Sequence, residues 1–234
     1  MAPAHIGIVS CSTEGAALCY RTVSLYASER LGPWTHPEVS LHTHCLADYM
    51  EAIDRDDWDG VAALMLSSAR KLQAAGADFL ICPDNTSHIA FPQVAKESPL
   101  PWLHIAEVVA ADAKAKGFRR IGILGTRYTM EGPVYPEKLG ALGLEYRRPL
   151  PAEIDLLDDI IFDELVNGRF TAESLGSFQE VIGRLGRDEG CDAVVLGCTE
   201  IPLLVPPCLS PLPALDSTRL LAQAAVDHAI RLRP

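Results

Sequence analysis

Two short stretches of the chain carry side chains that can perform acid–base chemistry. The first, ICPDNTSH at residues 81–88, places Asp84 just after an apolar run. The second, VVLGCTE at residues 194–200 after a similar run, places Cys198 at the corresponding point. A carboxylate or a thiolate can take a proton from a carbon acid and return one when its pKa suits the task. Asp84 and Cys198 are therefore our candidate catalytic residues.

Hydroxyl and amide side chains directly follow both candidates, namely Asn85 and Thr86 after Asp84 and Thr199 after Cys198, and two more threonines lie in GTRYTM at residues 125–130. Such residues often cap helices, and the backbone N–H groups at a helix start bind carboxylates. Their presence at both corresponding positions indicates that they bind a substrate carboxylate. The candidate substrate-binding residues are Asn85, Thr86, Thr126, Thr129 and Thr199.

Two further ionisable residues lie close to the candidates in sequence. His88 follows Asp84 by four residues, and Glu200 follows Cys198 by two. A histidine beside a thiolate can lower the pKa of that thiolate and relay protons. A glutamate can orient the histidine or a substrate ammonium group. We expect His88 and Glu200 to support the site.

The chain alternates short apolar runs with longer segments of helical spacing, which is typical of a parallel sheet covered by helices on both faces. Glycines such as Gly76 and Gly117 mark expected helix ends. The expected helices are 49–75, 106–116, 155–166, 174–186 and 218–232. The expected strands are 5–11, 39–44, 77–82, 102–105, 120–125, 145–148, 192–197 and 212–215.

The two halves of the chain resemble each other. IGIVSC at residues 6–11 matches IGILGT at 121–126, and DFLICPD at 78–84 matches DAVVLGC at 192–198. A third match pairs LPWLHIAE at 100–107 with SPLPALDS at 210–217. We therefore expect two copies of one α/β unit, residues 1–104 with 217–234 and residues 105–216. Ligands bind beyond the carboxyl ends of parallel strands, so we expect the active site in a cleft between the units.

The composition of the chain excludes some classes of binding partner. The 234-residue chain has a net charge of −11 and no basic cluster, which argues against nucleic acid or an anionic membrane as the main partner. A small-molecule substrate remains the expected partner. The N-terminal residues lack the pattern of a signal peptide, and the seven cysteines show no metal-type spacing, so we expect reduced thiols in the cytoplasm. Six of the thiols are expected to be structural: Cys11, Cys19, Cys45, Cys82, Cys191 and Cys208.

The sequence resembles the aspartate/glutamate racemase family, in its aspartate racemase branch. The resemblance runs over most of the chain and is most specific in LHIAEVVAADAKAKGFRRIGILGTRYTM and GCDAVVLGCTEIPLL. It implies two pseudo-symmetric α/β domains and amino-acid racemisation or epimerisation without pyridoxal phosphate, another cofactor or a metal. It also implies a homodimer, since family members are often dimers.

The family's usual mechanism uses two thiols, each at a strand-to-helix turn where the helix dipole favours a thiolate. Cys198 matches the second thiol, whereas Asp84 stands where the first is usual. Three interpretations stay open: Asp84 is itself a base, Asp84 orients the substrate while Cys198 works alone, or Cys82 substitutes. A helix N-cap without a chemical role is the fourth reading of Asp84.

The resemblance leaves the substrate open. The family commonly places a lysine for acidic substrates where this chain has Thr171, and Arg127 and Arg169 are the candidate replacements. Without a cation, a second substrate carboxylate would be desolvated and unpaired. An aspartate- or glutamate-like substrate is suspected, with a neutral amino acid or a malonate-like acid as alternatives. The alternative functions are a single-thiol decarboxylase or isomerase of the same superfamily and an inactive homologue that binds small molecules.

Overall fold

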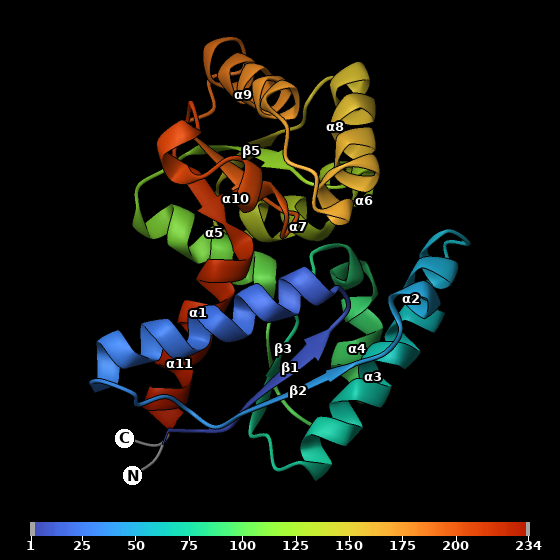
Figure 1. Cartoon of the computed structure of the whole chain (residues 1–234), viewed down its shortest axis with the longest axis vertical. Coiled ribbons are helices and arrows are strands. Elements are labelled where there is room, and N and C mark those ends of the chain that lie inside the picture. The colour runs from blue at the N-terminus through green and yellow to red at the C-terminus, as the bar shows by residue number, and fades with distance from the viewer. Residues whose placement is uncertain (1–2, 233–234) are drawn as a thin grey trace. The chain divides into compact units, whose positions relative to one another are not determined.

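The structure is a computed structural model that describes residues 3–232. The chain forms two compact units (Figure 1), one made of the residues up to Ile105 and those from Thr218 onward, the other of Ala106–Ser217. Each unit has its own four-stranded parallel sheet. Two parallel sheets flanked by helices confirm the expected α/β fold class.

The first sheet has the strand order β2-β1-β3-β4. Its strands are β1 (Ile6–Ser10), β2 (Val39–Thr43), β3 (Phe79–Ile81) and β4 (Trp102–Leu103). Strand β1 lies in the interior of the sheet and is buried along its whole length. Its partner β3 is also fully buried, so the apolar runs seen in the sequence form the centre of the unit.

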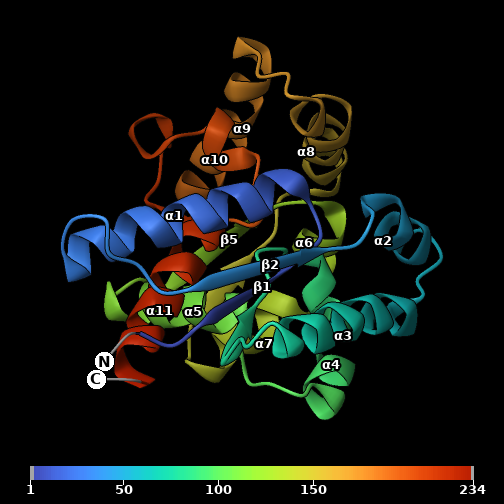
Figure 2. The same cartoon turned by 60° about the horizontal axis from the view of Figure 1, so that its bottom comes forward.

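Helices cover both faces of the first sheet. Helix α1 (Thr13–Leu31) and helix α3 (Trp58–Ala74) lie on opposite faces (Figure 2). Helix α11 (Ser217–Leu232) is tied to α1 by an ion pair of 2.6 Å between Arg30 and Asp227. The remaining elements of this unit are α2 (Leu46–Ile53), the 3₁₀ helix η1 (Thr86–Ala90) and α4 (Phe91–Glu97).

The single helix expected over residues 49–75 was wrong, because the chain forms α2 and α3 with a break between them. Asp56 in this break has a φ of 54°, a left-handed conformation that a helix cannot contain. Asp57 then caps the new helix, accepting a hydrogen bond of 2.8 Å from the backbone N–H of Gly60. The apolar periodicity continues across the break, which is why the sequence pattern did not reveal it.

The second sheet repeats the arrangement of the first, with the strand order β6-β5-β7-β8. Its strands are β5 (Arg120–Leu124), β6 (Glu145–Arg147), β7 (Ala193–Leu196) and β8 (Ala214–Asp216). Its α-helices are α5 (Ile105–Ala115), α6 (Arg127–Glu131), α7 (Val134–Ala141), α8 (Pro151–Asp163), α9 (Ala172–Arg187) and α10 (Ile201–Leu204). Two 3₁₀ helices, η2 (Leu165–Asn167) and η3 (Pro207–Leu209), complete this unit.

Local sequence signals explain most helix ends. Gly76 and Gly117 have φ values of 91° and 81°, so the glycines expected past two helix ends adopt the left-handed conformation that suits them. Helix α8 begins four residues before the expected start, because Pro151 opens it and the Glu153 carboxylate accepts the Leu150 N–H over 2.7 Å. Within residues 3–232, no helix is both long and apolar enough to cross a lipid bilayer.

Candidate active site

The first candidate site lies beyond the carboxyl ends of β1 and β3. These strands pair in parallel, with Ile8 opposite Ile81. Cys11 follows β1 directly, and Asp84 comes three residues after the end of β3, so both lie beyond the carboxyl edge of the sheet. Burial, and then the negative charge of Asp84, raise the pKa of Cys11 well above its ordinary value, so this thiol holds its proton at rest.

The Asp84 carboxylate is fixed by the chain that follows it. Its Oδ1 accepts the backbone N–H of Ser87 over 2.7 Å, the geometry of a capping aspartate. The Ser87 hydroxyl is completely buried and has no hydrogen-bond partner among the described residues. The Ser87 hydroxyl lies near the Cys11 thiol. It lowers the pKa of Cys11, whereas burial and Asp84 raise that pKa. Cys11, Asp84 and Ser87 therefore form one polar cluster at the strand ends.

His88 is buried, and backbone groups contact both of its ring nitrogens. The Ile105 N–H donates to Nε2 over 3.4 Å, which makes Nε2 an acceptor. Nδ1 therefore carries the proton, which it donates to the Asp84 carbonyl oxygen over 2.6 Å. The His104 and Phe91 rings pack against the imidazole, with centroids at 4.6 Å and 5.6 Å. This setting supports a positioning role for His88, since the ring holds the turn that carries Asp84.

Two more ionisable side chains border the Cys11 cluster. Cys82 is buried, and burial followed by the charge of Asp84 raises its pKa well above the ordinary value. The pKa of Tyr49 is raised as well, mainly by burial and then by Cys82, Cys11 and Asp84. The Tyr49 hydroxyl has Ser68 nearby but no well-aligned hydrogen bond. Both groups stay protonated, and Cys82 sits in the interior at the end of β3, which disfavours the interpretation that it substitutes for the missing thiol.

The second candidate site lies beyond β7. The Cys198 thiol, which is half-buried, donates a hydrogen bond of 2.9 Å to Oε2 of Glu200. The Thr199 hydroxyl donates to the same oxygen over 2.8 Å. Glu200 is only 3% exposed, so a buried carboxylate holds the thiol hydrogen. This arrangement gives Cys198 an internal acceptor for its proton, as a general base does for a nucleophile.

The candidate threonines lie beside Cys198. Leu124 of β5 pairs with Leu196 of β7, and Thr126 and Cys198 each come two residues after the end of their strand. Thr126 caps α6 and lies 3.3 Å from the Thr129 hydroxyl. A Cβ at Gly197 would lie 2.7 Å from the Leu124 carbonyl oxygen and 2.8 Å from Cγ2 of Thr129. The absence of a side chain at Gly197 therefore lets Thr129 pack directly over the strand end that carries Cys198.

Short helical elements follow both candidate positions. The 3₁₀ helix η1 after Asp84 runs directly into α4 at Phe91, and the element after Cys198 is the four-residue α10. The effect of a helix dipole on a charge is confined to the first turn. At Cys198 a side-chain carboxylate, that of Glu200, accepts the thiol hydrogen.

The expected replacements for the family lysine are already engaged. The Arg127 guanidinium forms ion pairs of 2.8 Å with Asp155 and 3.9 Å with Asp158. Arg169 donates to the carbonyl oxygen of Asp163. Thr171 caps α9 through a hydrogen bond of 3.0 Å from the Ser174 N–H. The charge of Arg127 is therefore compensated by carboxylates, whereas the carbonyl oxygen bound to Arg169 accepts a hydrogen bond without neutralising the guanidinium.

Of the other candidates, Asn85 is 3% exposed, whereas Thr86 is half-buried.

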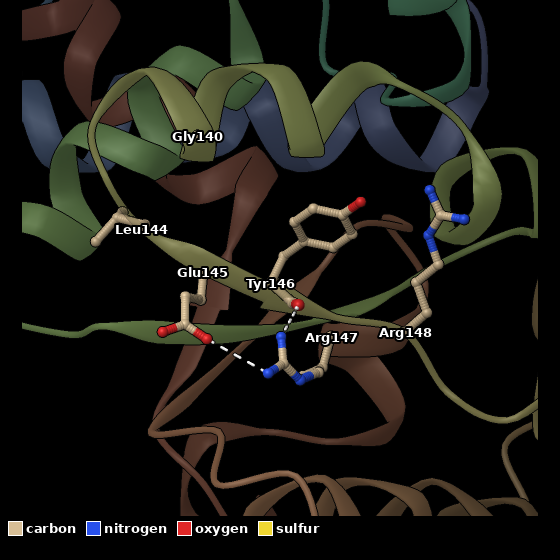
Figure 3. Close-up of a pocket in the computed structure, with 6 residues that line it drawn as sticks. All are labelled: Gly140, Leu144, Glu145, Tyr146, Arg147 and Arg148. Atoms are coloured by element: carbon tan, nitrogen blue, oxygen red, sulfur yellow. Dashed lines mark hydrogen bonds and ion pairs between the residues drawn. The ribbon is translucent and has the colours of Figure 1, made fainter.

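The second unit also has an open hollow of about 530 Å³ against the edge strand β6 (Figure 3). Gly140, Leu144 and the run from Glu145 to Arg148 line this hollow, and none of them is an expected site residue. In this hollow the Arg147 side chain is held by Glu145 and by the Tyr146 carbonyl oxygen.

Comparisons with known proteins give the family. The model of the Asp/Glu/Hydantoin racemase family matches residues 6–225, nearly the whole chain. The chain belongs to this family. This finding confirms the family resemblance expected from the sequence, because the match covers both units of the fold.

Solved structures of this racemase family superpose closely on the chain. A candidate Asp/Glu racemase from Yersinia pestis is 30% identical, with a TM-score of 0.89 over 97% of this chain and 99% of that one. An aspartate racemase homologue from Pyrococcus horikoshii OT3 is 27% identical, with a TM-score of 0.85 and the same coverage.

Curated relatives are more distant. The glutamate racemase of Aquifex aeolicus is 27% identical over 165 residues, which are 68% of this chain and 61% of that enzyme. The broad specificity amino-acid racemase RacX of Bacillus subtilis is 22% identical over 73% of each chain. The alignment thus spans somewhat less than two thirds of the Aquifex enzyme.

Cys11 was expected to be a structural thiol, and the structure buries it close to Asp84. The matched segments IGIVSC and IGILGT held the signal, because Cys11 corresponds to Thr126, itself a candidate site residue. Glu200 was expected to orient a neighbour, and the structure shows that its neighbour is the Cys198 thiol.

Proposed function

We propose that the protein is a cofactor-independent amino-acid racemase or epimerase that acts by removing and replacing the α-proton. The observation that carries this proposal is the hydrogen bond from the Cys198 thiol to the buried Glu200 carboxylate. A thiol with an internal proton acceptor can become the thiolate that takes a proton from carbon. Family membership over residues 6–225 supports the same reaction.

We assign the two acid–base positions of the reaction to Cys198 and Asp84. Each follows an interior strand of its own sheet, and the two sheets share one strand order. The substrate carboxylate is assigned to the polar side chains and backbone N–H groups around these positions. These are Asn85, Thr86, Thr126, Thr129 and Thr199, with His88 and Glu200 in support.

The cation pattern favours a substrate without a second carboxylate. Asp155 and Asp158 already compensate Arg127, so a second substrate carboxylate at Arg127 would lose its hydration to meet a cation that is already neutralised. Arg169 is the other candidate cation, and it is exposed to solvent. Aspartate and glutamate, the substrates that the family suggests, are therefore less favoured than neutral amino acids. The resemblance to an enzyme named for broad specificity agrees with this view.

Hydrogen exchange in deuterated water tests this function. Each enantiomer of alanine, serine, lysine, aspartate and glutamate is incubated with the protein, and the α-deuterium content and the enantiomer ratio are followed. We expect α-exchange together with racemisation of at least one of these amino acids. Cys198→Ala should abolish both while the far-ultraviolet circular dichroism spectrum stays unchanged. Turnover of Cys198→Ala near the wild-type rate would contradict every mechanism that uses this thiol.

A second candidate function is decarboxylation or isomerisation through Cys198 alone. The observation in its favour is that a carboxylate, rather than a thiol, follows β3 at residue 84. Exchange from one enantiomer only, with deuterated product from a malonate-like acid, would support this alternative. No exchange with any of these compounds would support an inactive binding protein.

A cytoplasmic homodimer remains a prediction, and sedimentation analysis of the purified protein measures its oligomeric state.

A further inference from the structure

The peptide group that precedes Cys198 is held from two sides. This group joins Leu196, the last residue of β7, to Gly197. Its N–H, that of Gly197, donates to the Leu124 carbonyl oxygen of β5 over 2.8 Å. Its carbonyl oxygen, that of Leu196, accepts the hydroxyl hydrogen of Ser217 over 2.9 Å. Because a peptide group is planar and rigid, these two bonds fix the direction in which the chain leaves the sheet toward Cys198.

The Ser217 hydroxyl extends the hydrogen bonding of the sheet beyond its last pair. The β7–β8 register ends with Leu196 opposite Asp216, and Ser217 follows as the first residue of α11. Ser217 and Leu196 are both buried, so the bond between them is closed to solvent. A hydrogen bond in such a low-dielectric setting is stronger than the same bond in water.

The glycine before Cys198 makes these bonds necessary. Glycine has more backbone freedom than any other residue. A larger residue does not fit, since a Cβ at Gly197 would lie 2.7 Å from the Leu124 carbonyl oxygen and 3.7 Å from Cε2 of Tyr135. A side chain at position 197 therefore cannot stiffen the chain, and hydrogen bonds from its neighbours must do so instead.

The first unit stiffens the corresponding point of the chain by other means. In the matched segments DFLICPD and DAVVLGC, Pro83 stands at the position of Gly197, and Asp84 at that of Cys198. Proline fixes its own φ and has no N–H to donate. The chain before Asp84 is thus rigid by its covalent structure, whereas the chain before Cys198 is not.

The position of Ser217 differs between the units in the same sense. The strand pairs that correspond in the two sheets are Ile81 with Leu103 and Val195 with Leu215. Two residues further along stand Ile105 in the first unit and Ser217 in the second. Isoleucine has no hydroxyl, and the Ile105 N–H donates to His88. The unit that has glycine before its reactive side chain is therefore the one that has a hydroxyl at this position.

We propose that Ser217 is a positioning residue for Cys198: its hydroxyl holds the Leu196 carbonyl group, and this bond sets where the thiol stands relative to the Glu200 carboxylate. The proposal rests on the racemase function proposed above, in which this thiol exchanges the α-proton. Ser217 acts through the backbone and exchanges no proton with the substrate. Misplacing a reacting group by about 1 Å can lower a rate about 100-fold.

The pH dependence of Cys198 alkylation tests the proposal without an activity assay. Iodoacetamide reacts with the thiolate, and tandem mass spectrometry locates the modification at Cys198 rather than at the exposed Cys45 and Cys208. A carboxylate beside a thiol opposes thiolate formation, so Glu200→Gln should move the profile to lower pH. We expect Ser217→Ala to move it in the same direction by a smaller amount. In the Glu200→Gln background, Ser217→Ala should move it no further.

Two further variants serve as controls. Ser68→Ala removes a hydroxyl that is equally buried, on α3 of the first unit, where it lies 3.0 Å from Nδ1 of His42. Ser217→Thr keeps the hydroxyl at position 217. Both should keep the wild-type alkylation profile. Profiles are measured at a temperature at which thermal unfolding curves show every variant folded, and Ser217→Gly takes the place of Ser217→Ala if the latter does not fold.

Racemisation kinetics give a second readout. Ser217→Ala should lower kcat by about 10-fold or more and leave KM within about twofold, because the hydroxyl places the reactive thiol rather than the substrate. Ser68→Ala should match the wild type in both constants.

Three results would overturn the role of Ser217. They are a wild-type alkylation profile in folded Ser217→Ala, an undiminished shift in the Glu200→Gln background, and the Ser217→Ala profile in folded Ser217→Thr. Each of them would leave the racemase function standing. A wild-type protein that exchanges no amino acid would instead overturn that function, and the alkylation profiles would still show whether Ser217 positions the thiol.

Discussion

The Cys198 thiol donates a hydrogen bond of 2.9 Å to Glu200, a carboxylate that is 97% shielded from solvent by the fold around it. The Thr199 hydroxyl donates to the same oxygen and so fixes its direction. A carboxylate held in this way can accept the thiol proton without rearrangement. In the proposed mechanism, the reactivity of Cys198 depends on Glu200 more than on the short helix α10.

Replacing Glu200 by glutamine tests this dependence. The amide keeps the size of the side chain but cannot take the thiol proton, so racemisation should fall by about 100-fold or more. Its rate should also rise toward higher pH, where the solvent removes the thiol proton instead. Glu180→Gln, at an exposed position on α9, is the matched control and should leave the pH–rate profile unchanged. A Glu200→Gln profile that parallels the wild type would contradict the role of general base.

Asp84→Cys places a thiol at the position where the family usually has one. The variant loses the acceptor for the Ser87 N–H, which should lower the free energy of unfolding by about 1 kcal/mol. It should nevertheless exchange α-hydrogen from both enantiomers, because a thiolate is well matched to a carbon acid. Exchange is measured from each enantiomer separately in deuterated water. One-sided exchange by the wild type together with two-sided exchange by the variant would favour the single-thiol function.

Gly197→Ala should disturb the strand end that carries Cys198. The added Cβ would meet the Leu124 carbonyl oxygen at 2.7 Å, and a backbone atom in a sheet cannot move aside cheaply. We expect the free energy of unfolding to fall by about 1–3 kcal/mol, measured by urea denaturation. Gly176→Ala on α9 is the control, because its Cβ would meet no atom within 4 Å. That variant should gain up to about 1 kcal/mol from its higher helix propensity.

Alkaline pH should destabilise the fold through the buried thiols. Burial raises the pKa of Cys19 to about 12, whereas an unfolded cysteine ionises near pH 8.5. Above pH 8.5 the native state thus binds more protons than the unfolded state, so stability falls as pH rises. For Cys19 alone the loss between pH 8.5 and 10 is about 2 kcal/mol. Urea denaturation from pH 7.5 to 10 should show a shallower decline for Cys19→Ala than for wild type.

The sequence predicted all eight strands because their apolar runs are short and bounded by turn residues. It also predicted the internal repeat, which the two identical strand orders bear out. It missed the break between α2 and α3, since a single left-handed Asp56 leaves no mark on apolar periodicity. It did not place Cys11 close to Asp84, for a different reason. These residues are far apart in the chain, and the parallel pairing of β1 with β3 brings the ends of the two strands together.

That register has a consequence for how proteins of this kind are compared. When sequences are aligned one position at a time, residue 84 counts as a catalytic thiol lost during divergence. When the ends of the adjacent strands β1 and β3 are read together, a thiol, Cys11, follows β1 and a carboxylate, Asp84, follows β3. Racemase relatives judged defective at one position are therefore worth inspecting at the structurally adjacent position before they are classed as inactive.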